Sequence, residues 1–308
     1  MIRNLLSYYE RRVMMAVVKR RKNEYLWIYI FLTPALVSLA LFGIWPMIAT
    51  GYFSFYRWNG IGWPSDFIGL KNYFELLKDP YFWNAFKNTF FYAFFQTLIK
   101  LPIALVLAVV LSETLIKAKS IYRVLFFLPV ILPTAVVSLD FKLILNPFTG
   151  PVNKLLTDFG IIDMPIDWFG LNLAMWTIIV VSTWQVTGRY MVYWLSGLQT
   201  IPRELYEAAD IDGANSFQKF LYITLPSLKK FTMIIILLGF VYALRVFDYV
   251  KIMTDGGPAY KTDVVSTYIY RLAFESQATR LGYASAVAFF FAMVLLAIGI
   301  TRTITNKG

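Results

Sequence analysis

The chain has 308 residues, of which 58% are hydrophobic and 15% are charged, and its mean hydropathy is +0.60. A soluble domain is nearer half apolar and a quarter charged, so the composition predicts an all-α membrane protein with several spans. Cysteine and histidine are both absent from the sequence, which excludes disulfides, thiol catalysis, imidazole acid–base chemistry and the usual zinc ligands.

The first 24 residues are polar and basic, and they predict a retained cytoplasmic tail rather than a cleaved secretory signal. Two alternatives stay open for this tail, a helix on the bilayer surface or a solvated segment. Residues 25–56 then carry no charge, which is ample for a first span at roughly 20 residues per crossing. Residues 57–86 predict an external loop with a short amphipathic helix near residues 73–77.

Five further apolar stretches complete a prediction of six transmembrane helices, at about 88–111, 124–145, 171–195, 231–253 and 284–304. Turn-forming residues predict external loops at 146–170 and 254–281, the second with a helix near 264–274. The chain is thus divided into a cytoplasmic tail (1–24), a transmembrane domain (25–304) and a short cytoplasmic C-terminal tail (305–308).

The distribution of Lys and Arg orients these spans. With the N-terminus inside, the cytoplasmic segments hold about 16 Lys and Arg, whereas the three external loops hold about 7. This asymmetry predicts that both termini are cytoplasmic. It also explains the net charge of +11 without a nucleic-acid partner, because basic flanks are usual on the cytoplasmic side of a membrane protein.

Residues 202–226 form the polar stretch that predicts a compact folded unit, and the orientation places it in the cytoplasm. The pattern predicts two short helices joined by a tight turn, because a proline suits the first helical turn, Gly213 suits a left-handed C-terminal cap and Ser216 suits an N-cap. Ala208 and Ala209 give the first helix a small-residue face. A second proline ends the unit before the next span.

Within this stretch, Glu207-Ala208-Ala209, Gly213 and Ile223-Thr224-Leu225-Pro226 stand at the spacing of the EAA loop, and the chain resembles the permease subunits of binding-protein-dependent ABC importers. In that family the loop is a coupling helix that docks into a groove of a cytoplasmic ATPase. The resemblance implies a polar contact for Glu207, close packing for the two alanines and the turn for Gly213. The residues implied in ATPase coupling are Glu207, Ala208, Ala209, Asp212, Gly213, Leu225 and Pro226.

The first external loop narrows the resemblance to the carbohydrate-uptake branch, the maltose and multiple-sugar permeases. It carries Phe67-Ile68-Gly69-Leu70-Lys71-Asn72-Tyr73, followed by Asp79-Pro80 and Phe82-Trp83. The resemblance covers about residues 25–304 and implies a multi-pass protein of a bacterial cytoplasmic membrane that moves a sugar by alternating access. It also implies four kinds of partner: a second permease subunit in a heterodimer, two ATPase subunits that bind ATP and Mg, an extracytoplasmic solute-binding protein docked on the external loops, and the lipid bilayer.

In such carbohydrate permeases the translocation path is lined near mid-membrane from the third to the fifth span. Aromatic faces stack on sugar C–H faces, and amides and charges bond hydroxyl groups. The resemblance therefore implies a substrate path formed by Trp184, Gln185, Arg189, Tyr190, Tyr193, Tyr242, Arg245, Asp248 and Tyr249. The alternative for the aromatic residues is lipid contact or core packing. Arg189 is the best candidate for a feature specific to this transporter.

Ionisable residues inside a membrane are costly unless they face a cavity, a partner charge or an interface. Lys100 is expected to snorkel, to pair or to touch substrate, and Arg245 and Asp248 are expected to neutralise each other at i, i+3 or to line the path. We hypothesise a net-positive cavity that favours an acidic glycan such as a uronate oligosaccharide. Its charges are Lys100, Lys142, Arg189, Arg245 and Lys251 against Asp140 and Asp248.

The sequence contains no GxxxxGKS/T phosphate-binding loop, so we expect no cofactor, no metal and no catalytic residue in this chain, and we assign ATP hydrolysis to the partner ATPase. A glycerol-phosphate or polyol ABC permease is an alternative substrate class. An ion-coupled secondary transporter predicts matching halves, which the sequence does not show. A membrane enzyme is disfavoured because no acid–base or metal constellation is evident.

Overall fold

The structure is a computed structural model that describes residues 27–112, 118–275 and 279–305. The predicted basic tail (1–24) lies outside the described residues, and so do Lys117 and most of the predicted C-terminal tail. The regular structure of the described residues is helical except for one antiparallel pair of short strands, β1 (Tyr56–Arg57) and β2 (Asp66–Phe67), in the predicted first external loop.

Three helices in the described part of the chain are long and apolar enough to cross a membrane. They are Trp27–Phe53, which contains η1 (Ala40–Ile44) and α2 (Trp45–Phe53), α4 (Pro80–Ser112) and α15 (Leu281–Thr305). Two bent helix pairs raise the number to five if each pair is one span. The predicted helical membrane fold is therefore confirmed, and the count of six spans remains a prediction. The fourth predicted span corresponds to α8 (Ala174–Leu198), which is less apolar because Gln185, Arg189 and several aromatic residues interrupt it.

Two spans that were predicted to be continuous are broken. The third is α5 (Lys119–Ile131) and α6 (Thr134–Ile144), which meet at 92° because Pro133 has no N–H to continue the hydrogen-bond ladder. The fifth consists of α12 (Lys229–Ala243) and a separate α13 (Asp248–Met253). The last turn of α12 tightens into i→i+3 bonds, and Phe247 then turns aside to place its ring 5.3 Å from that of Tyr270.

The predicted external helices are present. They are α3 (Lys71–Lys78) in the first loop, and α14 (Val265–Tyr270) with its continuation η3 (Arg271–Glu275) in the third; the second loop also contains α7 (Pro151–Asp158). The second span begins at Pro80 rather than near 88, because Asp79 caps it by accepting the N–H of Tyr81 at 2.9 Å. The same carboxylate accepts hydrogen bonds from Tyr268 and, at 2.6 Å, from Tyr283, so one residue ties the starts of α4 and α15 to α14.

The unit predicted for the cytoplasmic side is confirmed as two short helical pieces with a tight turn. It consists of α9 (Arg203–Ile211), then α10 (Ser216–Lys219), η2 (Phe220–Thr224) and α11 (Leu225–Ser227). Three details of the prediction are wrong. Pro202 is the N-cap of α9 rather than part of its first turn, the N-cap of α10 is Asn215 rather than Ser216, and the 71° bend follows Ser227 rather than Pro226.

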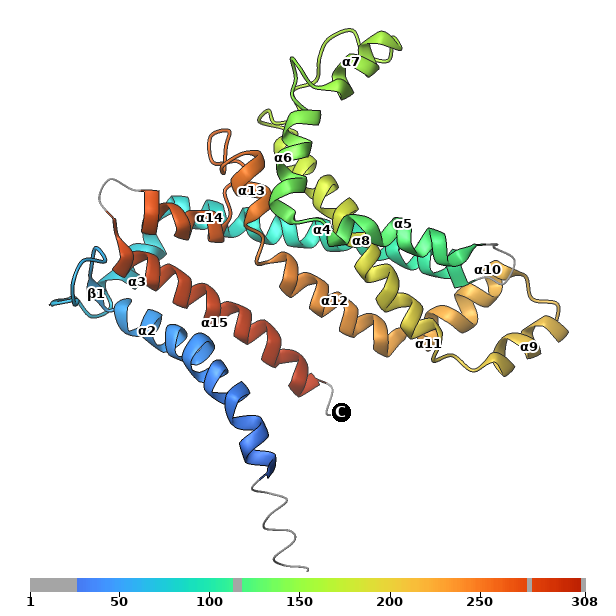
Figure 1. Cartoon of the computed structure of the whole chain (residues 1–308), viewed down its shortest axis with the longest axis horizontal. Coiled ribbons are helices and arrows are strands. Elements are labelled where there is room, and N and C mark those ends of the chain that lie inside the picture. Colours follow the sequence, from blue (N-terminus) through green and yellow to red (C-terminus); the bar gives the residue numbers. More distant parts are fainter. Residues whose placement is uncertain (1–26, 113–117, 276–278, 306–308) are drawn as a thin grey trace, which may run out of the picture.

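The helices pack as two groups (Figure 1). In one, α4 and α8 lie together with α5 and α12 against them, and in the other α2 runs along α15. Two apolar clusters form the core. The outer cluster includes Tyr92, Ile178 and Val250, and the inner cluster includes Leu101 and Trp194. The stretches of α4 and α8 between these clusters are polar, and that is where the site lies.

Candidate substrate path and coupling segment

A buried polar layer separates the outer and inner apolar clusters. Its members lie in the middle of α4 and α8 and are almost fully shielded from solvent: Gln96, Thr97, Lys100, Ser182, Thr183 and Gln185. Buried polar groups are unfavourable unless they are hydrogen-bonded. A polar layer in the middle of two apolar helices is therefore the candidate functional region, because packing alone does not favour it.

Gln185 connects three elements at this layer. Its side-chain nitrogen donates to the carbonyl oxygen of Leu132 at 2.9 Å, and its side-chain oxygen accepts from the Tyr249 hydroxyl at 2.6 Å. The Leu132 carbonyl lies at the break between α5 and α6, where a helix end leaves carbonyls without an intrahelical partner. Gln185 therefore positions Tyr249 and the bend, and both ends of its amide are already occupied.

A cavity of about 150 Å³ opens beside the polar layer. Four predicted path residues share its wall: Tyr242, Arg245, Asp248 and Tyr249. The structure adds Gln96 and Tyr92 from α4, together with Thr134 from the start of α6, three residues that were not predicted from the sequence. The signal that points to Gln96 is an amide inside an apolar span, four residues before Lys100.

The other predicted path residues lie around this cavity without lining it. The guanidinium of Arg189 lies 5.3 Å from the ring centroid of Tyr242, so it is one aromatic ring away from the wall. Tyr190 and Tyr193 have ring centroids 5.6 Å apart. Trp184 is half-exposed and packs against Phe141, with 5.3 Å between ring centroids.

Several predicted charge relationships change in the structure. Arg245 and Asp248 form no ion pair within the described residues, because Arg245 lies in the turn after α12 and Asp248 begins α13, so they do not share a helix face. Lys251 is neutralised instead, by ion pairs with Glu275 and, at 2.6 Å, with Asp255. Lys142 donates to the carbonyl of Ile252 at 2.9 Å. The excess positive charge near the cavity is thus smaller than the sequence suggests.

The coupling segment, residues 202–227, is a compact unit of two helical pieces joined by a turn. Gly213 has a φ of +73°, as predicted for a left-handed turn. An ion pair between Lys219 and Asp210 and a 2.8 Å hydrogen bond between Tyr206 and Thr224 join the two helical pieces. The reciprocal hydrogen bonds of the Asn215–Gln218 capping box, at 2.9 and 2.8 Å, fix the start of α10.

The surface of this segment is unusually apolar for an exposed one. No residue of α9 is buried, and Glu207 and Ala208 are exposed. Ile211, Phe217 and Tyr222 are 88%, 70% and 73% exposed. The resemblance to the EAA loop implies close packing only for the two alanines, whereas the structure adds these three large side chains. Apolar groups grouped on a rigid protrusion are typical of a docking surface.

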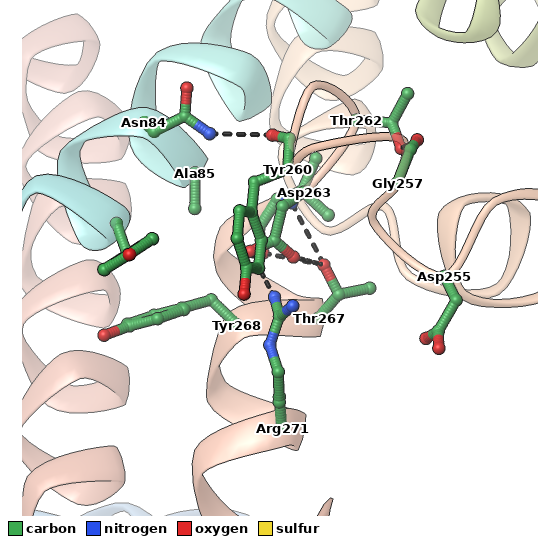
Figure 2. A network of polar contacts seen from close by, with 12 residues as sticks. Asn84, Ala85, Asp255, Gly257, Tyr260, Thr262, Asp263, Thr267, Tyr268 and Arg271 are labelled. Carbon is green, nitrogen blue, oxygen red and sulfur yellow. Dashed lines mark hydrogen bonds and ion pairs between the residues drawn. The ribbon is translucent and has the colours of Figure 1, made fainter. Parts of the chain in front are cut away.

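The first turns of α4 and the loop after α13 share a dense polar network, which we name the outer clamp. Figure 2 shows Asn84, Tyr260, Asp263, Thr267 and Arg271 of this network, and Asn88 completes it through bonds to the carbonyls of Tyr260 and Asp263. Asp263 is 1% exposed, pairs with Arg271 and accepts from Thr267 at 2.7 Å. The carbonyl of Tyr260 accepts from Asn84 at 2.7 Å. Burial raises the pKa of Asp263, although Thr267 and Arg271 favour its charged form.

These contacts attach the loop after α13 to the start of α4. Asn88 also donates to the carbonyl of Asp263 at 2.9 Å. Gly256 has a φ of +80°, and a Cβ at that position would lie 2.9 Å from a carboxylate oxygen of Asp263. The outer clamp is therefore a rigid platform whose polar groups are satisfied by one another.

Comparison with known proteins identifies relatives over nearly the whole chain. The model of the family described as binding-protein-dependent transport system inner membrane component matches residues 76–307. A probable ABC transporter permease protein, YurN of Bacillus subtilis, is 38% identical, covering 89% of this chain and 94% of that protein. The lactose transport system permease protein LacF of Rhizobium radiobacter is 33% identical, covering 87% and 89%.

A solved structure shares the fold. It is that of a bacterial ABC transporter involved in the import of the acidic polysaccharide alginate, with a TM-score of 0.81 and 26% identity over 94% of this chain and 98% of that chain. These relatives confirm the resemblance to carbohydrate-uptake permeases. The chain belongs to the family of binding-protein-dependent transport system inner membrane components, as a multi-pass, non-catalytic permease subunit of an ABC transporter.

Proposed function

We propose that this chain is the translocating subunit of an ATP-driven importer that carries an oligosaccharide by alternating access. Relatives whose names specify lactose or multiple sugars support the substrate class. The chain would pair with a second permease subunit, two ATPase subunits and an extracytoplasmic solute-binding protein. A periplasmic protein loaded with an alginate pentasaccharide is bound in a related transporter, which matches this chain with a TM-score of 0.79.

The observation that carries the proposal is the geometry of the coupling segment. Glu207 and Ala208 are exposed beside Ile211, on a helix that buries none of its residues and is closed by the Gly213 turn. A segment of this kind can transmit a displacement as one body, because an ion pair and a hydrogen bond join its two pieces. We assign the contact with an ATPase groove to Glu207, Ala208, Ala209, Asp212, Gly213, Leu225 and Pro226, now with Ile211 and Phe217.

The finer proposal is that the oligosaccharide is acidic. Arg245 lines the cavity without an ion-pair partner among the described residues, and Arg189 lies just behind the ring of Tyr242. These two guanidinium groups would attract carboxylates, for which bidentate hydrogen bonding suits arginine. The related structure from an importer of an acidic polysaccharide adds independent support.

The first test is purification from the native host through a tag on this chain, followed by an ATPase assay. We expect recovery with a second permease and an ATPase, and loss of both on Gly213→Pro, because proline cannot adopt a positive φ. Glu207→Ala should weaken the association, and Lys71→Ala, in the exposed external loop, is the control that should retain it. Recovery of a lone chain without nucleotide hydrolysis would favour an ion-coupled transporter instead.

The substrate class is tested by uptake into proteoliposomes that contain the recovered complex. The panel is an oligouronate, its carboxyl-reduced neutral counterpart, and glycerol 3-phosphate. Preference for the oligouronate that is lost on Arg189→Ala supports the acidic glycan. Uptake of glycerol 3-phosphate alone would replace the carbohydrate with a phosphate ester, and an unchanged preference in Arg189→Ala would contradict the assignment of that residue.

A further inference from the structure

Lys100 is the most deeply buried cation among the described residues. Its exposed fraction is 0%, in the middle of α4. The ammonium donates to the side-chain oxygen of Gln96 at 2.8 Å and to the carbonyl of Gly239 at 3.5 Å, and it lies 4.1 Å from the ring centroid of Tyr190. The lysine therefore neither snorkels to an interface nor pairs with an acid, two of the outcomes that its sequence context allowed.

This arrangement leaves the positive charge without a counter-charge. Within the described part of the chain, no carboxylate lies within ion-pair distance of the Lys100 ammonium. An ammonium has three donors, and here one of its two acceptors is at the limit of hydrogen bonding. Arg189, the residue before Tyr190, adds a second cation nearby rather than an anion. An unpaired charge at membrane depth is strongly unfavourable and is typical of a functional position.

Gln96 links Lys100 to the cavity. The same side chain accepts the ammonium hydrogen bond and forms part of the cavity wall. The charge is thus separated from the proposed path by one amide, on the side where a substrate would pass. Rotation of that amide would give an anion in the cavity access to Lys100.

The cover on the other side of Lys100 is α12. At Gly239, a Cβ would lie 3.2 Å from a ring carbon of Tyr190 and 3.5 Å from the Lys100 nitrogen. Glycine at this position therefore lets α12 approach until its backbone carbonyl meets the ammonium. Because α12 follows directly on the coupling segment, a displacement of that segment reaches the cover of Lys100 through one helix.

We propose that Lys100 is a shielded counter-charge for a carboxylate of the transported glycan. In this conformation Gln96, Tyr190 and α12 enclose the ammonium, and when α12 moves away from α4 the ammonium binds the substrate carboxylate in the path. The proposal rests on the proposed import of an acidic oligosaccharide and makes Lys100 a residue that determines its specificity.

The first experiment measures import of an alginate oligosaccharide and of its carboxyl-reduced counterpart by the full complex in proteoliposomes. Lys100→Met should lower import of the acidic sugar at least tenfold relative to the neutral one, and Lys100→Arg should keep part of the preference. Lys87→Met is the matched control, because Lys87 is exposed on the same helix. Equal losses for both sugars, or no change for either, would overturn the proposal.

A second experiment holds even if Lys100→Met assembles poorly. The natural sequence has no cysteine, so Lys100→Cys introduces a single thiol into this chain. Reaction with 2-aminoethyl methanethiosulfonate forms a disulfide, releases methanesulfinate and returns an ammonium to the site. We expect the preference for the acidic sugar to return with this reagent and not with its neutral methyl analogue. We also expect the labelling rate to differ at least tenfold between nucleotide-free and ATP-trapped complexes.

Recovery with both reagents, or labelling at the same rate in both states, would contradict a shielded counter-charge. An assembled Lys100→Cys complex that keeps its preference for the acidic sugar before any reagent is added would place the counter-charge elsewhere and overturn the proposal. Failure of the proposed function is a separate result, since the unmodified complex would then import neither sugar.

Discussion

The coupling segment and the outer clamp lie toward opposite ends of α4 (Figure 1). They differ in how far their side chains are covered within this chain. In the outer clamp, a carboxylate that is 1% exposed is bonded to Thr267 and Arg271, and neighbouring loop carbonyls accept from Asn84 and Asn88. The coupling segment has no such interior. Its helix α9 buries no residue, and Ile211 is 88% exposed.

This difference in burial indicates which of the two regions depends on a partner protein. Groups that satisfy one another need no second surface, so the outer clamp is complete within this chain. Large apolar side chains in water are unfavourable by about 25 cal/mol per Å² of exposed apolar surface, so the coupling segment becomes favourable only when another surface covers it. We therefore expect substitutions in the clamp to lower the stability of this chain, and substitutions in the segment to lower assembly.

The largest loss of stability should follow Asp263→Ala. Removing the carboxylate leaves the guanidinium of Arg271 and the hydroxyl of Thr267 without their buried partner, and breaking a buried ion pair in this way costs about 3 kcal/mol. Thermal unfolding of the purified complex in nanodiscs should show the change as a lower midpoint. Below that midpoint, Asp263→Ala should still associate with the ATPase.

The matched control is Asp66→Ala. Asp66 pairs with Arg57 at 3.6 Å, and the two side chains are 54% and 75% exposed. An exposed pair of this kind contributes about 0.5 kcal/mol or less. If the two variants unfolded at the same temperature, the clamp would not be the self-sufficient structure described above.

The next effect should be on assembly and not on folding. Ile211→Ser removes an exposed apolar side chain at the tip of the coupling segment, so the stability of this chain should not fall. Truncation of an anchor residue in an interface costs about 2 kcal/mol, or roughly 30-fold in affinity. Binding of the purified ATPase subunit to the permease complex measures this loss. Phe159, which is 77% exposed at the end of α7, gives the control variant Phe159→Ser, which should bind normally.

The turn of the coupling segment was predictable from sequence because its signals are local. Gly213 predicted a left-handed turn, and the spacing around Glu207 predicted the exposed helix that the structure shows. The cap at Asn215 was missed because Asn and Ser are both good N-caps, and the choice depends on whether Gln218 reaches back.

The substrate path was only partly predictable because it depends on long-range geometry. Tyr242 and Asp248 line one cavity as expected, but the break in the fifth span separated Arg245 from Asp248. Gln185 was expected to line the path, and its contact with Leu132 across 53 residues carries no local signal. The burial of Lys100 without a carboxylate partner among the described residues likewise depends on the position of α12.

The same substitution, glycine to alanine, can be made in both the outer clamp and the coupling segment and compares the two regions directly. Gly256 and Gly213 both have positive φ, which costs about 1 kcal/mol or more for an alanine. At Gly256 the new Cβ would also lie 2.9 Å from Asp263, whereas at Gly213 nothing lies within 4 Å. We expect both variants to lower the unfolding midpoint, Gly256→Ala by more because the Cβ contact adds to the backbone strain, and we expect only Gly213→Ala to alter ATPase association. Equal midpoints in the two variants would show that the clamp can relax around the extra methyl group.

The smallest expected effect tests whether the coupling segment moves as one body. Tyr206→Phe removes the 2.8 Å hydrogen bond to Thr224 that joins its two pieces, at a cost of about 1 kcal/mol. Because Phe keeps the ring, the docking surface should survive and ATPase binding should change less than threefold. Transport per ATP hydrolysed should fall, since a segment that can open at this contact transmits less of the displacement to α12. Thr200→Val is the control, because its hydroxyl bonds only the local carbonyl of Gly197 at 2.7 Å. An unchanged ratio of sugar imported to ATP hydrolysed in Tyr206→Phe would mean that the ion pair between Lys219 and Asp210 is sufficient to hold the two pieces of the coupling segment together.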